Sequence, residues 1–135
     1  MNSRDWDALH IVPEQVHSEF DSLPEEWKLR VENAVLKTFK PETDHRAKVL
    51  TTVTALYLNE IGGEPKLCRD GSKIIQPLPR TYLNRAMAKA SILLDLTVNR
   101  IEQICIYERC DGTDKRSVFI EDLTDINYQL ITYIN

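Results

Sequence analysis

The apolar residues between positions 83 and 105 recur at every third or fourth position over about six helical turns. This spacing places them along one face of an α-helix. They are Leu83, Ala86, Met87, Ala90, Leu93, Leu94, Val98, Ile101, Ile104 and Cys105. A long apolar stripe in the centre of a chain has to be buried against other elements, and its period predicts a mainly α fold.

Three earlier segments also have helical spacing of apolar residues, namely 13–20, 24–39 and 44–61. Proline at a first helical position, followed by two glutamates, favours a helix start at Pro24. Thr43 or Asp44 can cap the third segment. Gly62 suits the left-handed position at which helices commonly end. We therefore expect three helices before residue 64.

The stretch 64–79 has the composition of a loop, because Pro65, Pro77 and Pro79 bracket a turn at Asp70-Gly71. It divides the chain into an N-terminal helical segment, 1–63, a linker, 64–79, and a C-terminal segment, 80–135. The N-terminal segment is expected to serve dimerisation or partner binding.

Near the C-terminus the pattern changes from helical to strand-like. Arg116–Glu121 groups β-branched and aromatic residues, which favour a strand. Thr124 could then cap a last helix that carries Ile126 and Leu130. The predicted fold is thus mainly α, a small helical domain with one short β-hairpin between about residues 106 and 121.

Composition favours a single globular domain without catalytic chemistry. The 135 residues are 42% hydrophobic and 28% charged, near the globular average. The sequence has no Gly-rich phosphate loop, no Gly-x-Ser-x-Gly elbow and no His or Cys pair at metal-ligand spacing. We therefore predict a non-enzymatic protein with no cofactor and no metal. The three cysteines are an odd number without Cys-x-x-Cys spacing, which predicts reduced thiols. The sequence shows no export signal and no apolar run long enough to span a membrane. We therefore predict a cytoplasmic location.

Charge is unevenly distributed along the chain. The formal net charge is −4, yet residues 66–100 carry seven basic and two acidic side chains. A basic block within an acidic protein is a candidate footprint for an anionic partner such as double-stranded DNA. The alternative interpretation is an ordinary solvated face.

One motif lies within the long apolar stripe. Ser91 is a small residue that allows close helix packing, and Asp95 occupies the place of a turn residue. Leu96 would pack into the core, Thr97 would be the N-cap of a second helix, and the buried side chain of Ile101 would hold that helix against the core. This pattern resembles the helix-turn-helix of bacterial repressors.

The following residues, Arg109–Ile120, resemble the hairpin of the winged helix-turn-helix DNA-binding domains of bacterial regulators. The likeness covers residues 80–122, about a third of the chain. It implies a DNA-binding transcriptional regulator in which the second helix reads bases and basic residues of the hairpin and the first helix contact phosphates. The implied DNA-binding residues are Arg85, Lys89, Thr97, Asn99, Arg100, Gln103, Lys115 and Arg116.

Two alternatives remain open at the level of sequence. Residues 80–108 could instead form one continuous structural helix, in which Thr97 would cap nothing. The protein could then be a protein-binding inhibitor or accessory factor, of an anti-activator or phage type, that acts through helical interfaces. Either function is compatible with a homodimer, which we predict because the segment 24–61 holds more large apolar side chains than one small core requires. They are Trp27, Val31, Val35, Phe39, Leu50, Leu56 and Tyr57.

Overall fold

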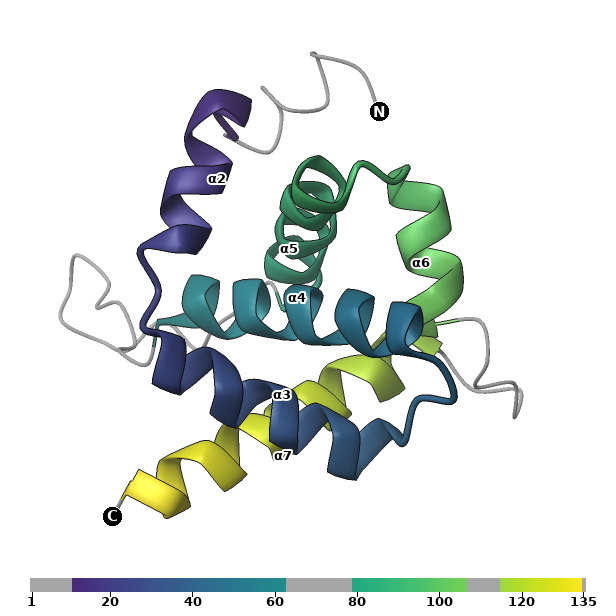
Figure 1. Cartoon of the computed structure of the whole chain (residues 1–135). Coiled ribbons are helices and arrows are strands. Elements are labelled where there is room, and N and C mark those ends of the chain that lie inside the picture. The colour runs from purple at the N-terminus through teal and green to yellow at the C-terminus, as the bar shows by residue number, and fades with distance from the viewer. Residues whose placement is uncertain (1–10, 63–78, 107–114, 135) are drawn as a thin grey trace, which may run out of the picture.

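The computed structural model describes residues 11–62, 79–106 and 115–134, and these residues form helices and no strand. Figure 1 shows their arrangement. The helices are α2 (Pro13–Asp21), α3 (Glu25–Phe39), α4 (Asp44–Ile61), α5 (Pro79–Leu94), α6 (Val98–Ile106) and α7 (Lys115–Ile134). Among the described residues, no helix is both long and apolar enough to cross a membrane.

The three helices predicted before residue 64 are confirmed, with one difference at a helix start. α3 begins at Glu25, and Pro24, predicted as its first helical residue, is its N-cap. Thr43 caps α4, since its hydroxyl oxygen accepts a hydrogen bond from the Arg46 backbone N–H at 3.1 Å. Gly62 ends α4 in the left-handed conformation, with φ of 56°. Glycine adopts this conformation without the steric cost that a Cβ atom would bring.

α4 is the central element of the fold. It packs against α3, α5, α6 and α7, and in Figure 1 it crosses the middle of the molecule with α3 below it. Every residue from Thr52 to Leu58 is buried, so this part of the helix is covered on all sides. The main apolar core joins residues of α3 and α4 to residues of α5, α6 and α7. The segments on either side of the predicted linker therefore share one core.

The apolar side chains that motivated the predicted dimer are used within this core. Val31, Val35, Leu50, Leu56 and Tyr57 are buried in the single chain, and the two further aromatic residues of that set pack partly buried against them. The premise that these side chains are surplus is therefore wrong. The homodimer remains a prediction without that support.

The strand predicted at Arg116–Glu121 is wrong, because these residues lie in the first two turns of α7. The buried residues of α7 are Phe119, Leu123, Ile126 and Leu130, which is a helical spacing. Packing of this stripe against α3 and α4 outweighs the local β-propensity of Val118 and Ile120, as tertiary contacts commonly do. The helix thus begins nine residues before the predicted cap, Thr124. The other half of the predicted hairpin, 107–114, and most of the loop 64–79 lie outside the described residues.

Candidate nucleic-acid interface

The chain turns sharply between α5 and α6. α5 ends at Leu94 and α6 begins at Val98, so three residues connect them. Asp95 has φ of 53°, in the left-handed region. The backbone N–H of Leu96 donates to the Ser91 carbonyl oxygen at 3.2 Å, which is the long hydrogen bond of a Schellman helix end. The continuous-helix interpretation of residues 80–108 is therefore wrong, and the predicted turn is confirmed.

Thr97 caps α6 as the motif predicts. Its hydroxyl oxygen accepts a hydrogen bond from the Arg100 backbone N–H at 3.0 Å, and its carbonyl oxygen accepts from the Ile101 N–H at 3.1 Å. Ile101 is fully buried and Leu96 packs partly buried against the same apolar core. Ser91, the predicted close-packing residue, is buried as well. The turn is thus held by backbone hydrogen bonds, by the cap and by two apolar contacts with the core.

This capping geometry leads to a prediction about stability. We expect Thr97→Ala to lower the free energy of unfolding by about 1 kcal/mol, because the Arg100 N–H loses its acceptor. Urea denaturation measures the change. Thr97→Ser keeps the hydroxyl and should remain within about 0.5 kcal/mol of the parent protein. A stabilised Thr97→Ala variant, which alanine would produce in a continuous helix, would contradict the cap.

The exposed face of α6 carries the side chains predicted to read bases. Asn99, Arg100 and Gln103 are exposed, and the Arg100 guanidinium donates to the Gln103 side-chain oxygen at 3.5 Å. Ile104 and Cys105 lie on the opposite, buried face. The structure therefore brings the cap Thr97 together with Asn99 and Arg100 at the N-terminal end of one short helix, and Gln103 lies one turn further along it.

Arg116 connects the start of α7 to both helices of the turn. Its guanidinium donates to the Asn84 side-chain oxygen of α5 at 2.6 Å and lies 3.0 Å from a Glu102 carboxylate oxygen of α6. Arg116 therefore braces α5, α6 and α7 and does not belong to a hairpin tip. Lys115, the first residue of α7, is half-buried beside it.

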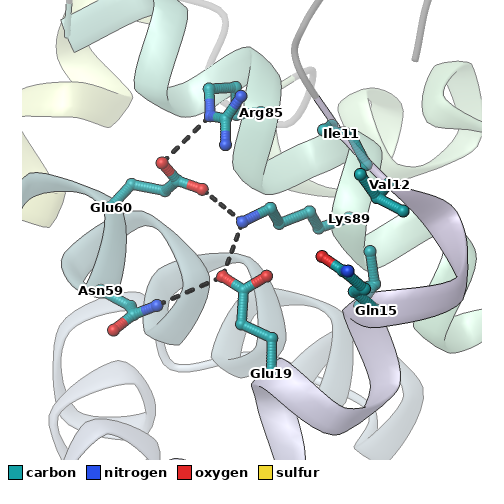
Figure 2. A pocket seen from close by; sticks show the side chains of 9 residues that line it. Ile11, Val12, Gln15, Glu19, Asn59, Glu60, Arg85 and Lys89 are labelled. Atoms are coloured by element: carbon teal, nitrogen blue, oxygen red, sulfur yellow. Dashed lines mark hydrogen bonds and ion pairs between the residues drawn. The ribbon is translucent and has the colours of Figure 1, made fainter. Parts of the chain in front are cut away.

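Arg85 and Lys89 were predicted to contact phosphates from α5, but they point into the fold. Lys89 is only 4% exposed. Its ammonium donates to Glu19 of α2 at 2.7 Å and to Glu60 of α4 at 2.5 Å. Arg85 Nε donates to the other Glu60 oxygen at 3.0 Å. We call Glu19, Glu60, Arg85 and Lys89 the charge cluster; Figure 2 shows Lys89 between its two carboxylates.

The acidic members of the charge cluster were not predicted. Glu60 lies 29 positions from Lys89 and Glu19 lies 70, so no local spacing relates them. One signal in the sequence does place Lys89 inside. Lys89 stands among the small residues Ala86, Ala88, Ala90 and Ser91. Small side chains allow neighbouring helices to pack closely on several sides of a helix, so a residue among them is buried as well. All residues from Ala86 to Ser91 are buried.

The electrostatics of the charge cluster are dominated by burial and by pairing. Burial alone would raise the pKa of the Glu60 carboxyl, but hydrogen bonds from Lys89 and Arg85, together with their charges, lower it below the usual 4.5. Glu60 is therefore ionised in the folded protein at neutral pH. Two cations then balance two carboxylates, and the cluster has no net charge.

The one described cysteine, Cys105, is buried. Burial raises the pKa of the Cys105 thiol to about 12, so it stays protonated at neutral pH. Among the described residues, no three His, Cys, Asp or Glu side chains are placed to hold a metal ion. Cys68, Cys110 and His10 lie outside the described residues.

No protein-family model, curated protein or solved structure matches this chain. The features of the chain that bear on its function are the turn between α5 and α6, the exposed face of α6 and the charge cluster.

Proposed function

We propose that this chain is a small, non-enzymatic transcriptional regulator of the cytoplasm that binds double-stranded DNA, with α6 as its recognition helix. The observation that carries the proposal is the turn at Asp95–Thr97, where a left-handed residue ends α5 and a threonine caps α6. Two helices joined by a three- or four-residue turn are the arrangement of the DNA-binding helix-turn-helix. The buried Ile101 fixes the rotation of α6 and thereby selects which side chains face outward.

The exposed side chains of α6 have the chemistry for reading base edges. An arginine can bond the two acceptors of guanine, and asparagine or glutamine can bond adenine through paired hydrogen bonds. Arg100 and Asn99 supply these groups at the N-terminal end of the helix, the part that enters the major groove in helix-turn-helix proteins, and Gln103 supplies an amide one turn further along. Thr97, beside them, can donate its hydroxyl hydrogen to a phosphate while its oxygen caps α6.

Contacts to the phosphate backbone come from fewer cations than the sequence suggested. The proposal keeps Lys115 as a phosphate contact and gives Arg116 a bracing role through Glu102 and Asn84. It leaves out Arg85 and Lys89, which belong to the charge cluster. With few cations beside α6, we expect weak non-specific DNA binding and a shallow salt dependence. A homodimer would place two copies of α6 on half-sites one helical turn apart.

The proposal predicts a specific loss for Arg100→Ala. On a DNA site selected from a random library, this change should weaken binding by about 1–3 kcal/mol and relax base preference at one position, because the paired bonds to guanine are lost. Fluorescence anisotropy with the selected site and with single-base variants measures both effects. Lys115→Ala should instead weaken binding to all sequences and reduce the salt slope by about one.

Arg30→Ala is the matched control for charge. Arg30 lies on α3, where it pairs with Glu26 at 2.9 Å, so its removal changes net charge by the same amount away from α6. DNA affinity should be nearly unchanged in this variant. If Arg30→Ala and Arg100→Ala weaken binding equally, or if no DNA is selected, then α6 is not a recognition helix.

A protein-binding function is the second candidate, and a different surface favours it. Leu29 and Leu36 lie seven positions apart on α3 and are 57% and 41% exposed. Leu36 also lines a groove of about 480 Å³ between α3 and α4, together with Ala47 and Thr51. Exposed leucines two turns apart are typical of a helix that docks on a partner. Failure to select DNA, with an intact fold, would favour this function as an inhibitor or accessory factor.

A further inference from the structure

A cavity of about 390 Å³ lies between α2, α4 and α5, beside the charge cluster. This volume falls at the lower end of the range for small-molecule sites. One side of the cavity is polar and includes Lys89 and Glu60, and Val16 of α2 and the two residues before that helix, Ile11 and Val12, also line it. Ile11 and Val16 are buried, whereas Val12 is 50% exposed. Figure 2 shows Ile11, Val12, Glu60 and Lys89 around the same space. The cavity therefore offers charged groups and, beside them, the exposed apolar side chain of Val12.

The polar side retains hydrogen-bonding capacity after its internal contacts are made. The Lys89 ammonium has three N–H donors, and two of them are used by Glu19 and Glu60. Glu19 accepts from Lys89 and from the Asn59 amide through one oxygen, Oε1. Three side-chain groups around the cavity make no hydrogen bond within the described part of the chain. They are the other carboxylate oxygen of Glu19, the side-chain amide oxygen of Asn59 and the side-chain amide of Gln15. Donors and acceptors thus remain side by side around the cavity.

The charge balance selects the class of molecule that fits. The charge cluster is neutral and partly buried, so a ligand with a net charge would bring an uncompensated charge into a poorly solvated space. A ligand that carries one positive and one negative group adds no net charge and can satisfy an acceptor and a donor at once. A wholly apolar ligand would leave the remaining polar groups without partners.

We propose that this cavity binds a free α-amino acid with a short aliphatic side chain. Its ammonium group would donate to the Glu19 carboxylate and to the side-chain amide oxygen of Asn59. Its carboxylate would accept from the third N–H of Lys89 and from the Gln15 amide. The aliphatic side chain would lie against Val12, the exposed apolar residue of the lining. This site is argued from its own chemistry and does not depend on DNA binding.

The first experiment compares amino acids with their one-charge analogues. L-leucine and L-valine are titrated into the full chain by isothermal calorimetry. The controls are 3-methylbutylamine, which lacks the carboxylate of leucine, and 4-methylpentanoate, which lacks its amine. We expect saturable binding of at least one amino acid, and binding at least about tenfold weaker for each leucine analogue than for leucine, because each loses hydrogen bonds between charged groups. For valine, the matching pair is 2-methylpropylamine and 3-methylbutanoate. The proposal is overturned if neither amino acid saturates at millimolar concentration, or if the analogues bind as well as the parent.

The second experiment uses variants that leave the charge cluster in place. Gln15 and Asn59 are exposed, so Gln15→Ala and Asn59→Ala should fold normally. Each should weaken amino-acid binding about five- to tenfold through the lost hydrogen bonds. Gln129→Ala, which removes the same amide from α7 at a different pocket, should have no effect. Equal affinities for Asn59→Ala and Gln129→Ala would place the ligand elsewhere and overturn the proposal.

Discussion

Replacing Lys89 by methionine is expected to lower the free energy of unfolding by about 3–5 kcal/mol. The change removes the ammonium but keeps most of the side-chain volume. It leaves Glu60 nearly buried with only Arg85 as its charged partner, and it detaches Glu19 of α2 from α5. The cost is large because a buried carboxylate that loses its partner is not resolvated. Urea denaturation followed by circular dichroism measures it.

Arg30→Met is the matched control, since it removes a cation from the exposed ion pair with Glu26. Such surface pairs contribute about 0–1 kcal/mol, so the loss should be small. Adding Glu60→Gln to Lys89→Met removes the uncompensated charge and should recover part of the stability. Equal losses for Lys89→Met and Arg30→Met would show that the charge cluster is solvated and contributes little.

The same cluster gives stability a predictable dependence on pH. The folded-state pKa of Glu60 lies below its ordinary value, so the unfolded state takes up this proton more readily. The stabilisation is therefore fully present above the unfolded-state pKa and is lost as pH falls through the folded-state pKa. In Lys89→Met that stabilisation is largely absent. The difference in unfolding free energy between the parent and this variant should therefore narrow as the pH falls below the ordinary pKa of a glutamate, 4.5.

Phe119→Ala is expected to destabilise the protein by about 3–5 kcal/mol. Phe119 is fully buried where α7 packs on α3, and its ring centroid lies 5.6 Å from that of Phe39. The substitution leaves a cavity and removes an aromatic contact, and both effects lower stability. Thermal or urea unfolding measures the loss.

Glu121→Ala provides the control on the same helix, because Glu121 is exposed and alanine favours helix. Its effect should be neutral or slightly stabilising. A loss of less than about 1 kcal/mol for Phe119→Ala would mean that α7 does not pack on α3 through this residue.

Local signals were sufficient for several elements of the fold and for the turn of the candidate site. Thr43 before α4 and Gly62 after it act through contacts within a few residues, and both predictions are confirmed. The end of α5 at Asp95 and the cap at Thr97 are of the same kind. Capping depends on residues three or four positions apart, which is why a sequence can specify it.

The sequence by itself therefore determined the helices before residue 64 and supplied the turn and cap residues Asp95 and Thr97, but it left a continuous helix over 80–108 open, and the structure decided for the turn. The tertiary structure alone decided that α7 begins at Lys115, because the stripe through Phe119 gains its stability only against α3 and α4. It also decided which side chains pair with Lys89, since its partners Glu19 and Glu60 come from other helices. Ion pairing over such separations depends on how the helices pack, and local spacing in the sequence does not specify that packing.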